Sequence, residues 1–108
     1  MLKSTVQVCV LGVALASPVI VKAEADAAKG KETFEQQCAV CHNADSEEKK
    51  MGPGLKGLFK RDKMKNGKAP TEENVRALVN EGGNGMPGYK DLLSDEERDN
   101  LIAYLKTL

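Results

Sequence analysis

Residues 38–42 read Cys38-Ala39-Val40-Cys41-His42, the most informative motif in the chain. Two cysteines three positions apart, followed at once by a histidine, form a Cys-x-x-Cys-His motif, which is typical of c-type haem attachment. Positions three apart on a helical segment share a face, so both thiols can add to the two vinyl groups at one side of a porphyrin. His42 is the only histidine in the chain and would offer a ring nitrogen to the iron.

Three other interpretations of this motif explain less of the sequence. A structural zinc site needs four good ligands, and beyond Cys38, Cys41 and His42 only scattered carboxylates remain. A thioredoxin-like redox pair requires a βαβ pattern, which the sequence lacks. A plain disulfide leaves both the histidine and the long loops unexplained. The motif therefore predicts one covalent haem c, bound by both cysteines, with His42 as an axial ligand of its iron.

The second axial ligand has three candidates, Met51, Met64 and Met86. Met51 follows His42 by nine residues and would have to round the haem edge immediately. Met64 stands between two lysines, which indicates a solvated position. Met86 lies in a glycine-rich loop, where the backbone can approach a flat ring closely, and the proline that follows stiffens the loop. Histidine with methionine is a known axial pair for haem iron, so Met86 is the favoured candidate.

The N-terminal segment differs in character from the rest of the chain. A short basic start, an apolar run from Val6 to Val21 and the small residue Ala23 predict a cleaved secretory signal peptide over residues 1–23. An uncleaved anchor is the alternative, but the run is short for a membrane span and contains a proline. Cleavage would leave residues 24–108 as one domain of 85 residues with a net charge of −2. A domain this small usually needs a cofactor, a metal or disulfides to complete its core.

The expected fold class is all-α, with three main helices and loops that wrap the haem. Apolar residues at helical spacing run from Ala27 to Cys41, from Val75 to Val79 and from Leu101 to Leu108. Ser94 and Glu97 form a capping box before the third helix. Residues 43–70 and 82–88 are rich in glycine and proline, which indicates loops, with one helical turn near residues 55–60. Loops this long are unusual in a small domain unless they enclose something.

From Gly30 onward the sequence resembles the class I c-type cytochromes, in particular small bacterial members with one haem. The resemblance implies the cytochrome c fold, in which Gly30 allows the last helix to cross the first closely. Phe34 and Tyr104 would pack at that crossing, next to Leu101. The chain has no tryptophan, so a tryptophan that binds a haem propionate in longer relatives is missing.

The stretch Gly52–Arg61 is similar to the loop that follows the haem motif in this family. The resemblance implies that the Pro53 carbonyl accepts a hydrogen bond from His42, that Leu55 packs on the haem face, and that Arg61 lies near a propionate. Gly85-Met86-Pro87 looks like the family's methionine-ligand loop. The implied cofactor-binding residues are Cys38, Cys41, His42, Pro53, Leu55, Arg61 and Met86, with His42 and Met86 on the metal.

This chemistry predicts a soluble periplasmic electron carrier rather than an enzyme, because no catalytic acid, base or nucleophile stands out. A haem protein with an open sixth site, acting as a gas sensor or a peroxidase-like enzyme, is the alternative. The expected partners are redox proteins that donate and accept electrons. Residues 49–68 carry a net charge of +7 and are candidates either to steer an acidic partner or simply to form a solvated loop. We expect a monomer, no nucleic-acid binding, and no stable membrane insertion after cleavage.

Overall fold

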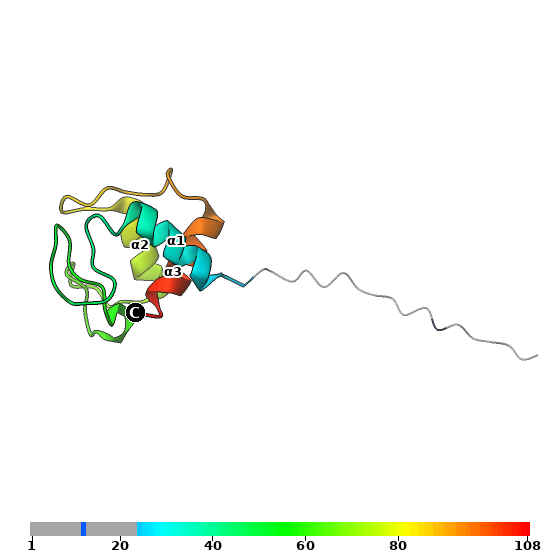
Figure 1. The fold of residues 1–108 in the computed structure, drawn as a ribbon, viewed down its shortest axis with the longest axis horizontal. Helices are drawn as coiled ribbons and strands as arrows, with labels where there is room; N and C mark the ends of the chain where they lie inside the picture. Colours follow the sequence, from blue (N-terminus) through cyan, green and yellow to red (C-terminus); the bar gives the residue numbers. More distant parts are fainter. Residues whose placement is uncertain (1–11, 13–23) are drawn as a thin grey trace, which may run out of the picture.

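The structure, a computed structural model, describes residue 12 and residues 24–108. The described residues form three α-helices, α1 (Ala27–Gln37), α2 (Glu72–Glu81) and α3 (Asp95–Leu105), and one short 3-10 helix, η1 (Leu58–Lys60) (Figure 1). No strand is found in this part of the chain, which agrees with the predicted all-α class. None of its helices is long and apolar enough to cross a membrane. The signal-peptide prediction for residues 1–23 concerns residues outside the described part, apart from residue 12, and stays a prediction.

Side chains cap the start of each α-helix, which explains why the helices begin where they do. The Asp26 carboxylate accepts hydrogen bonds from two backbone amides in the first turn of α1, and the Thr71 hydroxyl accepts one from the Asn74 amide in the first turn of α2. At α3, Ser94 and Glu97 form the predicted capping box, with each side chain bonded to the other's backbone. Caps of this kind satisfy backbone donors that a helix cannot satisfy itself.

The helices α1 and α3 cross at Gly30, as the resemblance implied. A Cβ atom placed on Gly30 would lie 1.8 Å from the Asn100 carbonyl oxygen, so only glycine permits this approach. Beside the crossing, the rings of Phe34 and Tyr104 lie 5.5 Å apart at an angle of 53°. The Asn100 side chain also accepts a hydrogen bond of 2.7 Å from the backbone amide of Asp26. The first and last helices are therefore fixed against each other along a close contact.

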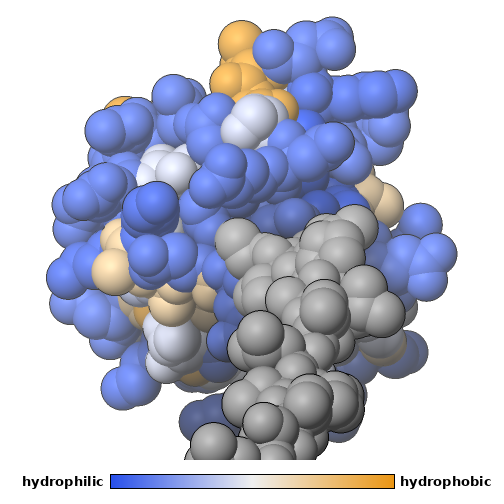
Figure 2. Space-filling model, turned by 90° about the vertical axis from the view of Figure 1, so that its right-hand side faces the viewer, coloured by the Kyte–Doolittle hydropathy of each residue, from blue (hydrophilic) through white to orange (hydrophobic). Residues whose placement is uncertain are grey.

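The helix α2 completes the group by packing against α3. Arg76 of α2 forms a salt bridge of 2.7 Å with Asp99 of α3, and a second ion pair joins Lys106 to Glu72. Figure 1 shows the three helices gathered together, with the loop of residues 43–70 extending from one side of them. The face turned away from that loop is largely hydrophilic where it is visible in Figure 2. The apolar core therefore lies between the helices and the long loops.

The sequence pattern placed Cys38 and Cys41 on the first helix, but α1 ends at Gln37. The backbone amides of Cys38 and Ala39 both bond to the Phe34 carbonyl, at 2.8 and 2.9 Å, so the regular ladder stops there. A separate turn follows, in which the amides of Cys41 and His42 bond to the Cys38 carbonyl. Tight turns of this type often close a helix C-terminus. The expected helix was thus too long by one turn, although the turn keeps the two cysteines close together.

Candidate haem-binding site

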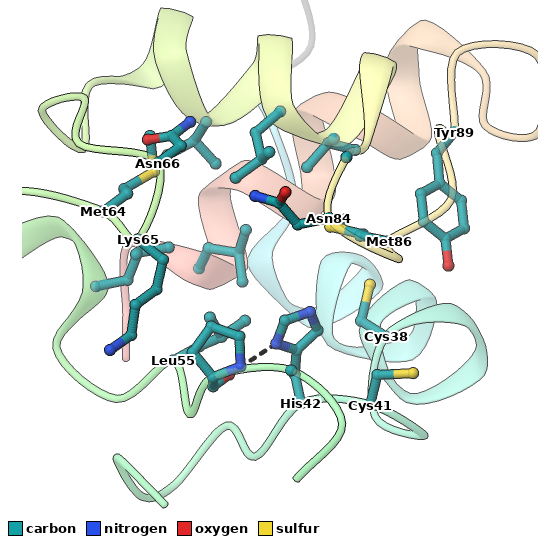
Figure 3. A pocket seen from close by; sticks show the side chains of 18 of the residues that line it. Cys38, Cys41, His42, Leu55, Met64, Lys65, Asn66, Asn84, Met86 and Tyr89 are labelled. Atoms are coloured by element: carbon teal, nitrogen blue, oxygen red, sulfur yellow. Dashed lines mark hydrogen bonds between the residues drawn. The ribbon is translucent and has the colours of Figure 1, made fainter. Parts of the chain in front are cut away.

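A cavity of about 350 Å³ lies between the helices and the two long loops (Figure 3). Its residues come from all three α-helices, from η1 and from both loops, so no single segment could form it. The wall is mostly apolar and includes Leu55, Leu58, Val75, Val79, Leu101 and Leu105. An apolar cavity in a domain of this size leaves the core incomplete unless a cofactor fills it.

The two cysteines lie at one edge of the cavity and are not joined to each other in a disulfide (Figure 3). Burial, reinforced by the neighbouring Cys41 thiol, raises the pKa of Cys38 to about 11. Before haem attachment the Cys38 sulfur is therefore a neutral thiol near pH 7, since the thiolate is disfavoured where water is excluded. Both cysteines line the cavity, so their thiols are the groups that would attach one edge of a flat ring there.

His42 forms one face of the cavity, and its ring is held from behind. Its Nδ1 atom donates a hydrogen bond of 2.7 Å to the Pro53 carbonyl, which leaves Nε2 directed into the cavity (Figure 3). The ring also lies against the Gly52 backbone, where a Cβ atom would come within 2.5 Å of the His42 Cε1 atom. A hydrogen bond of this kind fixes the tautomer and orientation of a ligating histidine. The role of Gly52 was not predicted from the sequence.

Met86 lies across the cavity from His42, at the end of a tight hairpin (Figure 3). The backbone amides and carbonyls of Gly83 and Met86 exchange two hydrogen bonds of 3.0 Å. The two residues between them have positive φ, 52° at Asn84 and 87° at Gly85. This is the geometry of a type I′ turn, for which Asn-Gly is the preferred sequence. The Asn-Gly pair was the feature of the sequence that could have predicted how Met86 is presented.

The other two methionines differ in their surroundings. Met51 is 79% exposed, and its sulfur lies 3.9 Å from that of Cys41. Met64 is only 8% exposed and lines the cavity, so the interpretation of Met64 as solvated was wrong. Backbone hydrogen bonds from Met64 to Lys68 and from Gly67 to Met64 fold this segment back on itself. The turn directs Met64 inward despite the lysines on either side.

Leu55 and Arg61 both line the cavity, as expected of residues in the loop after the motif. The Nη2 atom of Arg61 donates two hydrogen bonds of 2.8 Å, one to the Gly54 carbonyl and one to the Lys56 carbonyl. The guanidinium therefore holds the backbone on both sides of Leu55. Arg61 has a structural role in this loop that the sequence did not reveal.

Tyr89 is a further site residue that the sequence analysis missed. It lines the cavity, is 8% exposed, and its hydroxyl donates a hydrogen bond of 2.9 Å to the Gln37 carbonyl. Burial, with smaller effects from the two cysteines, raises the pKa of Tyr89 above its ordinary value. The bond joins the loop that carries Met86 to the C-terminus of α1, which precedes the cysteines. Its partner lies 52 positions away, too far for any local pattern to indicate it.

The residues around the cavity fit a covalently attached haem. Two thiols lie at one edge, an imidazole nitrogen and a thioether face each other across the space, and most of the remaining wall is apolar. Thiols supply the covalent bonds of a c-type haem, and imidazole and thioether are recognised ligands of its iron. Such a haem would supply one-electron chemistry, while the chain supplies attachment, orientation and a water-poor surrounding.

Comparisons with known proteins agree with this assignment. Residues 25–105 match the family model described as cytochrome c oxidase, cbb3-type, subunit III. The chain is 38% identical to cytochrome c2 of Blastochloris viridis, with 85% of each chain covered. It is 36% identical to cytochrome c6 of Synechocystis sp., over 75% of this chain and 64% of that protein. The structure resembles cytochrome c6 from the diatom Phaeodactylum tricornutum, with a TM-score of 0.61, 28% identity, and 76% and 92% of the two chains covered.

The protein is therefore a small class I c-type cytochrome with the all-α cytochrome c fold, and its cofactor is a covalently bound haem c. The chain belongs to the c-type cytochrome family whose model is described as cytochrome c oxidase, cbb3-type, subunit III. It is an electron-transfer protein and not an enzyme, in agreement with the expectation from the sequence.

Proposed function

We propose that this protein is a periplasmic one-electron carrier whose haem iron is bound by His42 on one face and Met86 on the other. The observation that supports this proposal is the placement of the two side chains on opposite walls of one cavity (Figure 3). Cys38 and Cys41, at the edge of the cavity, would hold the haem ring between His42 and Met86.

The chain's own contacts account for a rigid axial pair. The Pro53 carbonyl fixes the His42 ring, and the Asn-Gly hairpin fixes the backbone of Met86. A ligand set that barely moves between oxidation states keeps the reorganisation on electron transfer small. A neutral thioether opposite histidine also favours ferrous iron and raises the reduction potential. With both axial positions filled, oxygen or peroxide would have no open coordination site.

The location and partners follow from the sequence together with this chemistry. Cleavage after residue 23 would release the domain of residues 24–108 into the periplasm, without stable membrane insertion. There it would exchange electrons, as a monomer, with redox proteins that act as donor and acceptor. The basic segment of residues 49–68 is the part of the surface suited to attract an acidic partner. N-terminal sequencing of protein from a periplasmic fraction should begin close to Glu24, and a mature chain that retains Met1 would contradict export with cleavage.

The axial ligands can be tested by the visible spectrum of the oxidised holoprotein matured through an export pathway. The weak long-wavelength band of a thioether bound to ferric haem should be present, and Met86→Ala should abolish it. Met51→Ala is the matched control, because Met51 is 79% exposed and should leave the band unchanged. Absence of the band in the unmodified protein, with a high-spin spectrum, would show an open sixth site. Ligand binding or peroxide chemistry would then replace electron transfer as the leading function.

A further inference from the structure

A second cavity of about 550 Å³ adjoins the haem cavity and differs from it in character. The two share Pro53, Arg61, Met64 and Lys65 in their walls. The charged residues that line the second cavity are three cations and one acid: Arg61, Lys63, Lys65 and Glu47. Positive charge therefore gathers where the two cavities meet.

The cysteines determine which part of the haem faces this positive region. In protoporphyrin the vinyl groups and the propionates lie at opposite edges, so attachment at Cys38 and Cys41 directs the propionates to the far side of the cavity. Figure 3 shows Lys65 at that far side, across the cavity from both cysteines. Propionates are carboxylates, which lose much of their hydration when the ring is enclosed and then require cationic partners.

We propose that Lys65 binds a haem propionate at the junction of the two cavities, with Lys63 and Arg61 supplying the surrounding positive charge. The proposal rests on the haem attachment described above but not on the identity of the second axial ligand. It assigns to Lys65 the propionate contact that longer relatives make with a tryptophan, which this chain lacks.

Lys65 is better placed for this contact than either of its cationic neighbours. Arg61 already donates two hydrogen bonds from Nη2 to loop carbonyls. Lys63 lines the second cavity but not the haem cavity. Lys65 lines both, and among the described residues no carboxylate forms a salt bridge with it.

The backbone around Lys65 keeps its position with little freedom. Met64 next to it is buried at 8% exposure, and its amide bonds to the Lys68 carbonyl at 2.8 Å. The amide of Gly67 bonds back to the Met64 carbonyl at 2.9 Å, and Gly67 has a φ of 81°. The turn is thus anchored on the core side, so a propionate would pair with a lysine whose backbone is already ordered.

The expected consequence concerns the pH dependence of the reduction potential. An ammonium group close to a carboxylate lowers the pKa of that carboxylate by about 1–3 units. Lys65 should therefore keep the propionate ionised down to low pH, helped by Lys63 and Arg61 and opposed by Glu47. As the pH is lowered, the reduction potential should stay nearly constant until the propionate takes up a proton. Below that pH the reduction potential should rise, because a negative charge near the iron has been lost.

The test is a titration of the reduction potential against pH for holoprotein variants. In Lys65→Gln the pH at which the potential begins to rise should lie at least about one unit above that of the unmodified protein. Lys65→Arg should restore the original profile. Lys68→Gln removes the same charge three residues away, from an exposed side chain that lines neither cavity, and should leave the profile unchanged.

Each result decides the matter. An unchanged profile in Lys65→Gln, or an equal shift in Lys68→Gln, would overturn the proposal. If Lys65→Gln does not mature, Lys65→Met keeps the apolar stem of the side chain and must show the same shift. The thioether band, recorded on the same samples, tests Met86 separately. A protein without that band but with the predicted pH shift would refute the axial pair and support the propionate site.

Discussion

Replacing Gly30 with alanine tests whether the crossing of α1 and α3 determines the stability of the domain. The added methyl group would lie 1.8 Å from the Asn100 carbonyl oxygen and 2.9 Å from the Tyr104 Cβ atom. The first contact is with backbone, which cannot rotate away as the end of a side chain would. The two helices would have to separate by about 1.5 Å to reach an ordinary van der Waals distance.

Two opposing effects set the size of the change. Overpacking of this kind costs about 1–3 kcal/mol, and a clash with backbone belongs at the upper end of that range. Alanine is favoured over glycine inside a helix by about 1 kcal/mol, which offsets part of the cost. The net loss in the free energy of unfolding should be about 2 kcal/mol. For a domain of this size, that loss lowers the melting temperature by about 10 °C.

The assay is thermal unfolding of the oxidised holoprotein, followed by far-ultraviolet circular dichroism and by haem absorbance in parallel. Gln36→Ala is the control, because Gln36 is an exposed residue of α1 and its replacement should change stability by no more than about 0.5 kcal/mol. A Gly30→Ala protein as stable as the unmodified one would show that the close crossing does not limit stability. The reasoning from the 1.8 Å contact would then be refuted.

Two further predictions concern the cofactor and the loop that follows Met86. The double change of Cys38 and Cys41 to alanine should leave a largely disordered chain by circular dichroism, because the cavity then has no covalent haem to complete the core; a cooperative transition with native helicity would count against this. Tyr89→Phe removes the hydrogen bond to Gln37 and should lower the free energy of unfolding by about 1 kcal/mol at pH 7. The raised pKa of Tyr89 means that the unfolded state ionises first, so its contribution is complete below pH 10 and is lost as the pH rises through the folded-state value. The stability of Tyr89→Phe should therefore fall less steeply above pH 10, and equal slopes in alkaline denaturation would contradict this.

The sequence predicted those parts of the site that local chemistry determines. The Cys-x-x-Cys-His motif places two thiols and an imidazole within five residues, so their proximity needs no information from the rest of the fold. The capping box at Ser94 is likewise a matter of four consecutive residues, and the structure confirms it. The resemblance to class I cytochromes added the close crossing at Gly30, which the structure also contains.

The sequence was least informative where a residue's surroundings come from distant segments. Met64 stands between two lysines and reads as solvated, yet the turn closed by Gly67 directs it into the core. Tyr89 gave no pattern, because Tyr89 lies in a loop and its partner Gln37 ends α1, 52 positions away. The end of α1 was predicted one turn too late. The helix stops where the Phe34 carbonyl accepts hydrogen bonds from two successive amides, and this change depends on how the chain turns toward the cavity.

Spacings of three or four positions along the chain were thus enough to predict the groups that would attach the haem and the residues that begin the helices. Only the folded chain shows that Met86, the methionine favoured by the sequence, lies across from His42, and that Lys65 lies at the edge opposite the cysteines. Those relationships join segments more than 20 residues apart, and only the packing of α1 against α3 and the folding of the two loops bring them to one cavity. Burial and charge in this protein are properties of that assembly, not of any single stretch of its sequence.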